Sequence, residues 1–230
     1  MRKYLLAGVA LATIGCISIP ASAAVIDLTF EGINATYPSG FASINGFYDG
    51  GTSSDGTSGP NFGISFPSNA LAICLNSTTV SCSNTSRGGL GDPASQQGGL
   101  FFLSGTNTFV DVAAGFTTGF SFFYTAIGVG GSVQVFSGLD GTGTLLATLT
   151  LPTTASSCVG YNAGFCPFVP FGVTFAGTAQ SISFNGVANQ IVFDDVTFGS
   201  ETPGAIPEPA SLALLGAATA GLGLLRRRRR

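Results

Sequence analysis

The chain has 230 residues, of which 45% are hydrophobic and 8% are charged, and it contains no histidine and no tryptophan. The absence of histidine removes the usual general base of Ser-His and Cys-His catalysis. The formal net charge of -3 is unevenly distributed, because residues 24–206 carry one basic residue, Arg87, against ten acidic ones, a net charge of -9. This charge disfavours nucleic acid as a partner and favours divalent cations or neutral glycans.

The first 23 residues have the pattern of a secretory signal peptide. Two basic residues precede an apolar run over residues 4–19, and a small-x-small pattern ends at Ala23. We therefore predict cleavage by signal peptidase between Ala23 and Ala24, which makes the protein an exported one. A lipoprotein signal centred on Cys16 is the alternative, but Thr13 stands where such signals usually carry an aliphatic residue.

Residues 24–199 are predicted to form one all-β domain, a single antiparallel β-sandwich. Apolar and polar residues alternate along 26–31, and turns rich in Gly, Asn, Asp and Pro separate this segment from others like it. No helical stripe is found between the two ends of the chain. The predicted strands are 26–31, 62–66, 70–75, 99–103, 109–112, 119–125, 132–136, 145–151, 168–175, 181–184 and 190–198.

Residues 46–61 form a long polar segment with five glycines and two aspartates. One interpretation is a flexible surface loop. The other is a loop folded over a cation or a glycan, with Tyr48 as a stacking platform and Asp49 and Asp55 as ligands, because long ordered loops are often functional. An EF-hand is excluded, since the Asp-x-Asp-x-Asp-Gly spacing and the closing Glu are absent.

Four cysteines remain after removal of the signal peptide: Cys74, Cys82, Cys158 and Cys166. An even number in an exported chain is typical of disulfides, and four cysteines allow three connectivities. We favour the two local pairs, Cys74 with Cys82 and Cys158 with Cys166, which enclose loops of equal length. Zinc is disfavoured, because histidine is absent and the spacing differs from Cys-x-x-Cys.

The C-terminal segment follows a linker over residues 200–206, in which Glu201 is interpreted as a solvated spacer. An uncharged apolar run over residues 210–225 would form a helix of about 24 Å, slightly shorter than a ~30 Å hydrocarbon core. The arginine stems beyond it can reach the headgroups on the cytoplasmic side. We therefore expect a transmembrane helix that tethers the precursor to the inner membrane. The flanking residues are Pro207, Glu208, Pro209, Arg226, Arg227, Arg228, Arg229 and Arg230.

This order of Pro-Glu-Pro, apolar run and arginine cluster resembles the PEP-CTERM sorting signal of Gram-negative bacteria. The resemblance implies recognition and cleavage near Pro207 to Pro209 by exosortase, a membrane-embedded cysteine transpeptidase-like enzyme. It also implies a host that makes exopolysaccharide or biofilm matrix, and a mature protein on the cell surface or in that matrix. The three residues of the motif would then be acted upon and would not be catalytic.

The segment 47–72, together with 30–32 and 193–196, resembles the ectodomains of PEP-CTERM proteins, which are jelly-roll sandwiches of the galactose-binding or carbohydrate-binding-module type. The resemblance implies one structural Ca²⁺, held by Glu31 and by Asp194 or Asp195. Strict alternation along the last strand would place these two aspartates on opposite faces, so that they could not act as a pair. The competing interpretation is that the acids accept backbone hydrogen bonds at a strand end.

Two classes of function remain. The first is a non-enzymatic surface or matrix protein with a structural, adhesive or glycan-binding role. The second is a secreted polysaccharide hydrolase that uses a pair of carboxylates, although nothing in the sequence selects such a pair. Enzymatic function is disfavoured further because residues 24–206 contain no lysine and no phosphate-binding loop.

Overall fold

The computed structural model describes residues 25–34, 40–74, 98–126, 128–154 and 168–204. The predicted signal peptide, the Pro-Glu-Pro motif, the apolar run and the arginine cluster lie outside these residues, as do Cys82, Cys158 and Cys166. Cys74 directly follows a strand and is fully buried. The disulfide pairing therefore stays a prediction. In the part of the chain that the structure covers, no helix has the length and apolar character needed to cross a membrane.

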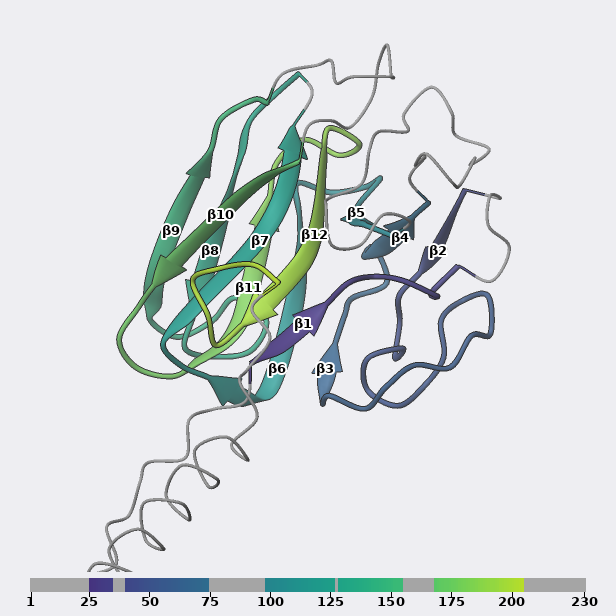
Figure 1. The fold of residues 1–230 in the computed structure, drawn as a ribbon, viewed down its shortest axis with the longest axis horizontal. Coiled ribbons are helices and arrows are strands. Elements are labelled where there is room, and N and C mark those ends of the chain that lie inside the picture. Colours follow the sequence, from purple (N-terminus) through teal and green to yellow (C-terminus); the bar gives the residue numbers. More distant parts are fainter. Residues whose placement is uncertain (1–24, 35–39, 75–97, 127, 155–167, 205–230) are drawn as a thin grey trace, which may run out of the picture.

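The described residues form two antiparallel sheets (Figure 1). A seven-stranded sheet has the order β10-β7-β12-β5-β4-β2, with β1 also paired to β12, and a five-stranded sheet has the order β3-β6-β11-β8-β9. The strands are β1 (Ile26–Leu28), β2 (Phe41–Ser43), β3 (Ile64–Ser65), β4 (Leu71–Ile73), β5 (Leu100–Phe101), β6 (Asn107–Phe116), β7 (Gly119–Ala126), β8 (Gly131–Phe136), β9 (Leu145–Leu151), β10 (Val169–Thr174), β11 (Ala179–Asn185) and β12 (Ile191–Phe198).

Eight of these strands have the connectivity of a jelly roll. In the larger sheet, β1, β12, β7 and β10 are successive antiparallel neighbours, and in the smaller sheet β6, β11, β8 and β9 are. The chain crosses between the sheets after every strand from β6 to β11 except at the β8–β9 hairpin, which gives the double Greek key of a jelly roll. The strands β2 to β5 extend the two edges. The predicted all-β jelly-roll sandwich is confirmed.

Phenylalanine fills the space between the sheets. Phe122 on β7, Phe184 on β11 and Phe193 on β12 are fully buried. The ring centroids of Phe184 and Phe193 are 4.5 Å apart, and Phe122 meets both rings in edge-to-face geometry. Such pairs add to the stabilisation that comes from burying apolar surface. A chain without tryptophan thus builds its core from smaller aromatic rings.

The observed strands agree closely with the predicted ones, except that β2 was not predicted and that the alternation changes within β12. Each of the eleven predicted segments overlaps an observed strand, and 145–151 coincides with β9. The three-residue β2 was not predicted, because a segment this short shows no alternation and its pairing with β4 provides the structure. The last strand departs from the prediction in a different way, since its two aspartates do not follow simple alternation.

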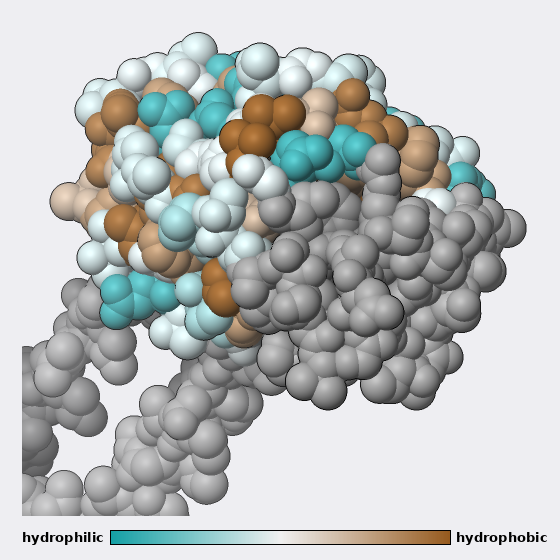
Figure 2. All heavy atoms as spheres, turned by 90° about the horizontal axis from the view of Figure 1, so that it is seen from above, coloured by the Kyte–Doolittle hydropathy of each residue, from teal (hydrophilic) through white to brown (hydrophobic). Residues whose placement is uncertain are grey.

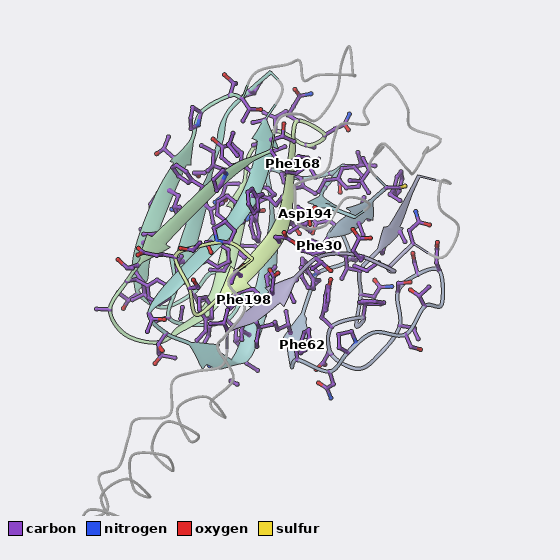
Figure 3. All side chains as sticks on the ribbon, in the orientation of Figure 1. Phe30, Phe62, Phe168, Asp194 and Phe198 are labelled. Atoms are coloured by element: carbon purple, nitrogen blue, oxygen red, sulfur yellow. The ribbon has the colours of Figure 1, made fainter. Side chains whose placement is uncertain are left out.

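A β-bulge interrupts β12 between Asp194 and Thr197. Asp195 has a left-handed φ of 43°, a conformation that is uncommon outside glycine. Phe193 before the bulge and Val196 after it both belong to the core. Strict alternation along this strand would put Asp194 on the same face as Val196, and this expectation is wrong, because the extra residue of a bulge reverses the alternation. Figure 3 labels Asp194 on this strand.

The aromatic core predicts a large difference between two phenylalanine substitutions. Phe184→Ala should lower the free energy of unfolding by about 3–5 kcal/mol, because it leaves a cavity among packed rings. Phe41→Ala removes a side chain that is 51% exposed and should cost less than about 1 kcal/mol. Urea denaturation followed by circular dichroism measures both. Equal losses would contradict the assignment of the core.

Candidate functional site

Tyr48 does not present its ring to solvent. The side chain is 4% exposed, and its hydroxyl accepts a hydrogen bond of 2.9 Å from the backbone N–H of Phe30. Phe62 stacks on its outer side, with the ring centroids 6.2 Å apart and an interplanar angle of 14°. The prediction that Tyr48 is a stacking platform is therefore wrong. Tyr48 stands at the start of a polar stretch, which suggests exposure, but its contacts with Phe30 and Phe62 bury it.

The loop over residues 46–61 is tied to the rest of the domain by hydrogen bonds. The hydroxyls of Ser53 and Thr57 donate to the carbonyl of Ile33 over 2.9 and 2.8 Å. Backbone bridges join Asp49 to Asn61 and Thr52 to Ser58. Asp49 thus lies at the base of the loop. Asp55 lies at its tip, and both aspartates are exposed. The structure does not bring the two predicted ligands to one point.

The two acids of the predicted calcium site accept backbone hydrogen bonds. Glu31 Oε1 accepts from the N–H of Gly98 at 3.1 Å, and Asp194 Oδ1 accepts from the N–H of Asp195 at 2.8 Å. Ca²⁺ takes about six to eight oxygen ligands. Nowhere in the described ranges do three or more acidic, cysteine or histidine side chains gather as a metal site. A calcium ion held by Glu31 and Asp194 therefore stays a prediction.

The bulge of β12 instead brings the Asp195 carboxylate close to the Asp27 carboxylate on β1. Asp27 pairs with Thr197 in the sheet, and the Thr197 hydroxyl donates to Asp27 Oδ1 over 3.0 Å. The pKa of Asp27 is raised from its ordinary 3.8 to about 6, first by burial and then by the neighbouring Asp195 carboxylate, whereas the hydrogen bond from Thr197 opposes the rise. Asp195 itself has no exposed surface. The sequence did not suggest this pair, because the bulge that creates it leaves no mark on the pattern.

The outer surface of the five-stranded sheet carries neutral polar side chains and two aromatic rings. Successive side chains of a strand point to opposite faces, and Val110, Val133 and Ile182 point into the core. Their neighbours therefore point outward. We call this surface the polar face; its neutral members are Asn107, Phe109, Ser132, Gln134, Phe136, Thr148, Thr150, Ser181, Ser183 and Asn185, and Asp111 on β6 points outward at its end.

Side-chain hydrogen bonds join three strands across the polar face. Asn107 Nδ2 on β6 donates to Ser183 Oγ on β11 over 3.4 Å, and Ser183 Oγ donates to Asn185 Oδ1 over 2.9 Å. Asn185 Nδ2 then donates to Gln134 Oε1 on β8 over 3.4 Å. These amides are partly exposed, and among the outward-facing side chains of the described strands β6, β8 and β11 Asp111, at the end of the polar face, is the charged one. Such a surface can exchange hydrogen bonds with hydroxyl groups, and its neutral members offer no catalytic acid or nucleophile–base pair.

A loop closes one end of the polar face. The Gly141 N–H donates to Ser181 Oγ at 3.0 Å, and the Asp140 N–H donates to Asp111 Oδ1 at 2.8 Å. A side chain at Gly141 would come within 2.5 Å of the Phe109 ring, so the loop rests directly on that ring. The alternation around Ser183 in the sequence is the signal that could have revealed the polar face.

The rest of the described surface is a mixture of small apolar and polar areas. Figure 2 shows one end of the sandwich, where small hydrophobic and hydrophilic areas alternate. Scattered apolar side chains of this kind are normal for a folded protein. In Figure 3, Phe62 lies beside β3, away from the polar face. Its ring is 40% exposed and provides a natural comparison for the rings of the polar face.

The acid pair predicts a stability that depends on pH. Because the pKa of Asp27 is raised in the folded state, its contribution to stability is fully present below about pH 3.8 and is lost as the pH rises through about 6. Asp27→Asn keeps an acceptor for Thr197 and removes the charge. The variant should gain stability over the wild type between pH 5 and pH 7.5, as measured by thermal denaturation. Asp55→Asn, an exposed control, should follow the wild type; an Asp27→Asn curve parallel to the wild type would contradict the assignment.

Comparison with known proteins adds one specific match. Residues 205–230 match the family model described as the PEP-CTERM protein-sorting motif, so the predicted sorting signal is confirmed. The comparison with curated proteins gives no match. A solved family 6 carbohydrate-binding module, whose binding subsites were dissected by crystallography and calorimetry, is similar at 22% identity, with 55% of this chain and 91% of that chain covered and a TM-score of 0.31. At this distance the likeness does not inform on a ligand. The C-terminal segment is a PEP-CTERM sorting motif.

Proposed function

We propose that this protein is exported, is processed by exosortase at its sorting motif, and acts at the cell surface or in the extracellular matrix as a non-enzymatic binding protein for neutral glycans. The sorting motif over residues 205–230 supports the first part. The polar face of the five-stranded sheet supports the second part, the binding of neutral glycans. The ligand class follows from its chemistry.

The polar face suits a ligand that is rich in hydroxyl groups and has no charge. Its amides and hydroxyls can both donate and accept hydrogen bonds, and the Phe109 and Phe136 rings offer apolar surface to the C–H face of a sugar ring. The domain has a net charge of -9 over residues 24–206, which disfavours anionic polymers through long-range repulsion. Neutral exopolysaccharide is the partner that meets these conditions.

The hydrolase alternative receives less support from the geometry. A glycosidase needs two carboxylates on either side of an accessible glycosidic bond, about 5–9.5 Å apart. Asp27 and Asp195 do come together, but Asp195 is fully buried. A substrate could not reach that pair without local unfolding. We therefore propose binding without turnover.

The sorting half of the proposal predicts a C-terminal truncation that depends on exosortase. Mass spectrometry of the native protein should show loss of the segment beyond the Pro-Glu-Pro motif in a strain that has exosortase. The same protein should keep all five terminal arginines when the enzyme is deleted. An intact C-terminus in both strains would refute the proposed processing.

The binding half predicts a difference between Phe109, which is half-buried on the polar face, and the exposed Phe62. Affinity electrophoresis through gels that contain dextran, xylan or galactomannan should slow the wild-type protein in at least one gel, and a gel with the anionic polymer alginate should not. Phe109→Ala should weaken the binding about tenfold, which corresponds to ~1.4 kcal/mol of lost aromatic contact. Phe62→Ala, which follows the loop 46–61 directly, is the control outside the polar face and should leave the affinity unchanged.

The same samples also separate binding from hydrolysis. Incubation with the retained polysaccharide should release no reducing ends. Release of reducing ends would favour the hydrolase. Loss of binding in Phe62→Ala, with normal binding in Phe109→Ala, would move the site from the polar face to the loop.

A further inference from the structure

The segment that follows the last strand is packed onto the domain. We call residues 199–204 the strap; Figure 1 shows it crossing the seven-stranded sheet in yellow. The Gly199 N–H donates to the Gly119 carbonyl over 2.9 Å, and Ser121 Oγ donates to the Ser200 carbonyl over 3.0 Å. Most of the predicted linker over residues 200–206 is thus part of the folded sandwich, up to the last described residue, Gly204.

Two glycines of the sheet make room for the strap. A Cβ atom at Gly172 on β10 would lie 2.0 Å from the Glu201 carbonyl oxygen, and one at Gly119 on β7 would lie 2.7 Å from the Glu201 nitrogen. Real Cβ atoms do not approach other atoms so closely, so the backbone of Glu201 rests directly on the sheet. A shallow pocket of about 210 Å³ lies beside this contact, lined in part by Pro170 and Pro203.

The end of the strap is fixed beside the acid pair. The Gly204 N–H donates to Thr197 Oγ1 over 3.0 Å, and Thr197 is the residue that donates to Asp27. An atom at the Cβ position of Gly204 would be 4.0 Å from Asp195 Oδ2. Within the strap, the Thr202 N–H donates to Ser200 Oγ over 3.0 Å and closes a tight turn. The strap is therefore held at both ends and in its middle.

The docked strap limits how far the sorting motif can extend from the domain. Pro207 follows Gly204 by three residues, and three extended residues span at most about 10 Å. If the strap were released from Phe198 onward, the same proline could extend about 30 Å. The apolar run begins only three residues after Pro207, so the docked domain stays close to the membrane surface and crowds any membrane-embedded enzyme that acts on the motif.

We propose that the strap is a latch that controls access to the sorting motif, with Gly119, Gly172 and Thr197 as the residues that determine its position. While the strap is docked, the folded sandwich restricts the approach of exosortase. Its release lengthens the connection and exposes the motif. The inference rests on the proposed processing by exosortase, and it adds to that proposal the domain residues that set its rate.

Gly172→Ala tests the latch in the full-length precursor. In cells that contain exosortase, pulse-chase labelling should show processing at least threefold faster than in the wild type. Hydrogen exchange of the precursor in detergent should show faster exchange in peptides that cover residues 199–204. Gly130→Ala is the matched control, because its Cβ would lie 2.3 Å from the Leu151 carbonyl oxygen, a comparable clash away from the strap. It should leave both measurements at the wild-type level.

Two further variants keep the test decisive. Thr197→Val removes the acceptor of the Gly204 N–H and should act in the same direction, which covers the case in which Gly172→Ala fails to fold. A six-residue Gly-Ser insertion after Ala205 adds about 20 Å of reach and should speed processing without releasing the strap. The insertion should have no further effect in Gly172→Ala.

The outcomes separate the latch from the processing on which it rests. Faster hydrogen exchange of residues 199–204 with an unchanged rate of processing would overturn the latch. An equally faster processing of Gly130→Ala would do the same. Absence of processing in the wild type and in every variant would overturn the exosortase proposal and the latch together. Faster processing in Gly172→Ala and Thr197→Val but not in Gly130→Ala, with faster exchange of the strap, would support both.

Discussion

The pairing of the first strand with the last holds the molecule together. β1 and β12 meet in register, and this contact completes the larger sheet of the jelly roll. It also sets Asp27 opposite Thr197, while the bulge of β12 turns Asp195 toward the same place. Thr197 in turn accepts the N–H of Gly204 and fixes the end of the strap. One strand pair therefore supports the fold, the buried acid pair and the position of the C-terminal segment.

The fold could be predicted from the sequence because alternation is a local signal. Segments such as 145–151 show which side chains are buried without reference to any other part of the chain. The candidate site could not be predicted in the same way. The burial of Tyr48 depends on Phe30, a residue distant in the sequence, and the left-handed conformation of Asp195, which changes the phase of β12, leaves no mark on the pattern. The strap has the Gly, Ser, Thr and Pro composition of a linker, which gives no sign of its fit to Gly172.

The ectodomain separates its charged and neutral surfaces. The acids that meet, Asp27 and Asp195, lie on the larger sheet beside the strap, whereas the network across the polar face of the smaller sheet is made of neutral amides and hydroxyls, with Asp111 at its end. A largely neutral polar surface on an acidic domain suits the uncharged polymer proposed as its ligand, while the remaining charge repels like-charged chains.

The contact between Asp27 and Thr197 joins residues 170 positions apart in the chain. An exported polypeptide emerges with its N-terminal part first. β1 is therefore exported long before β12, the strand with which it pairs. Contacts of such long sequence separation also form slowly in folding. The sandwich can close only when the residues next to the sorting motif have left the translocation channel, and the completion of folding therefore coincides with the arrival of that motif at the membrane.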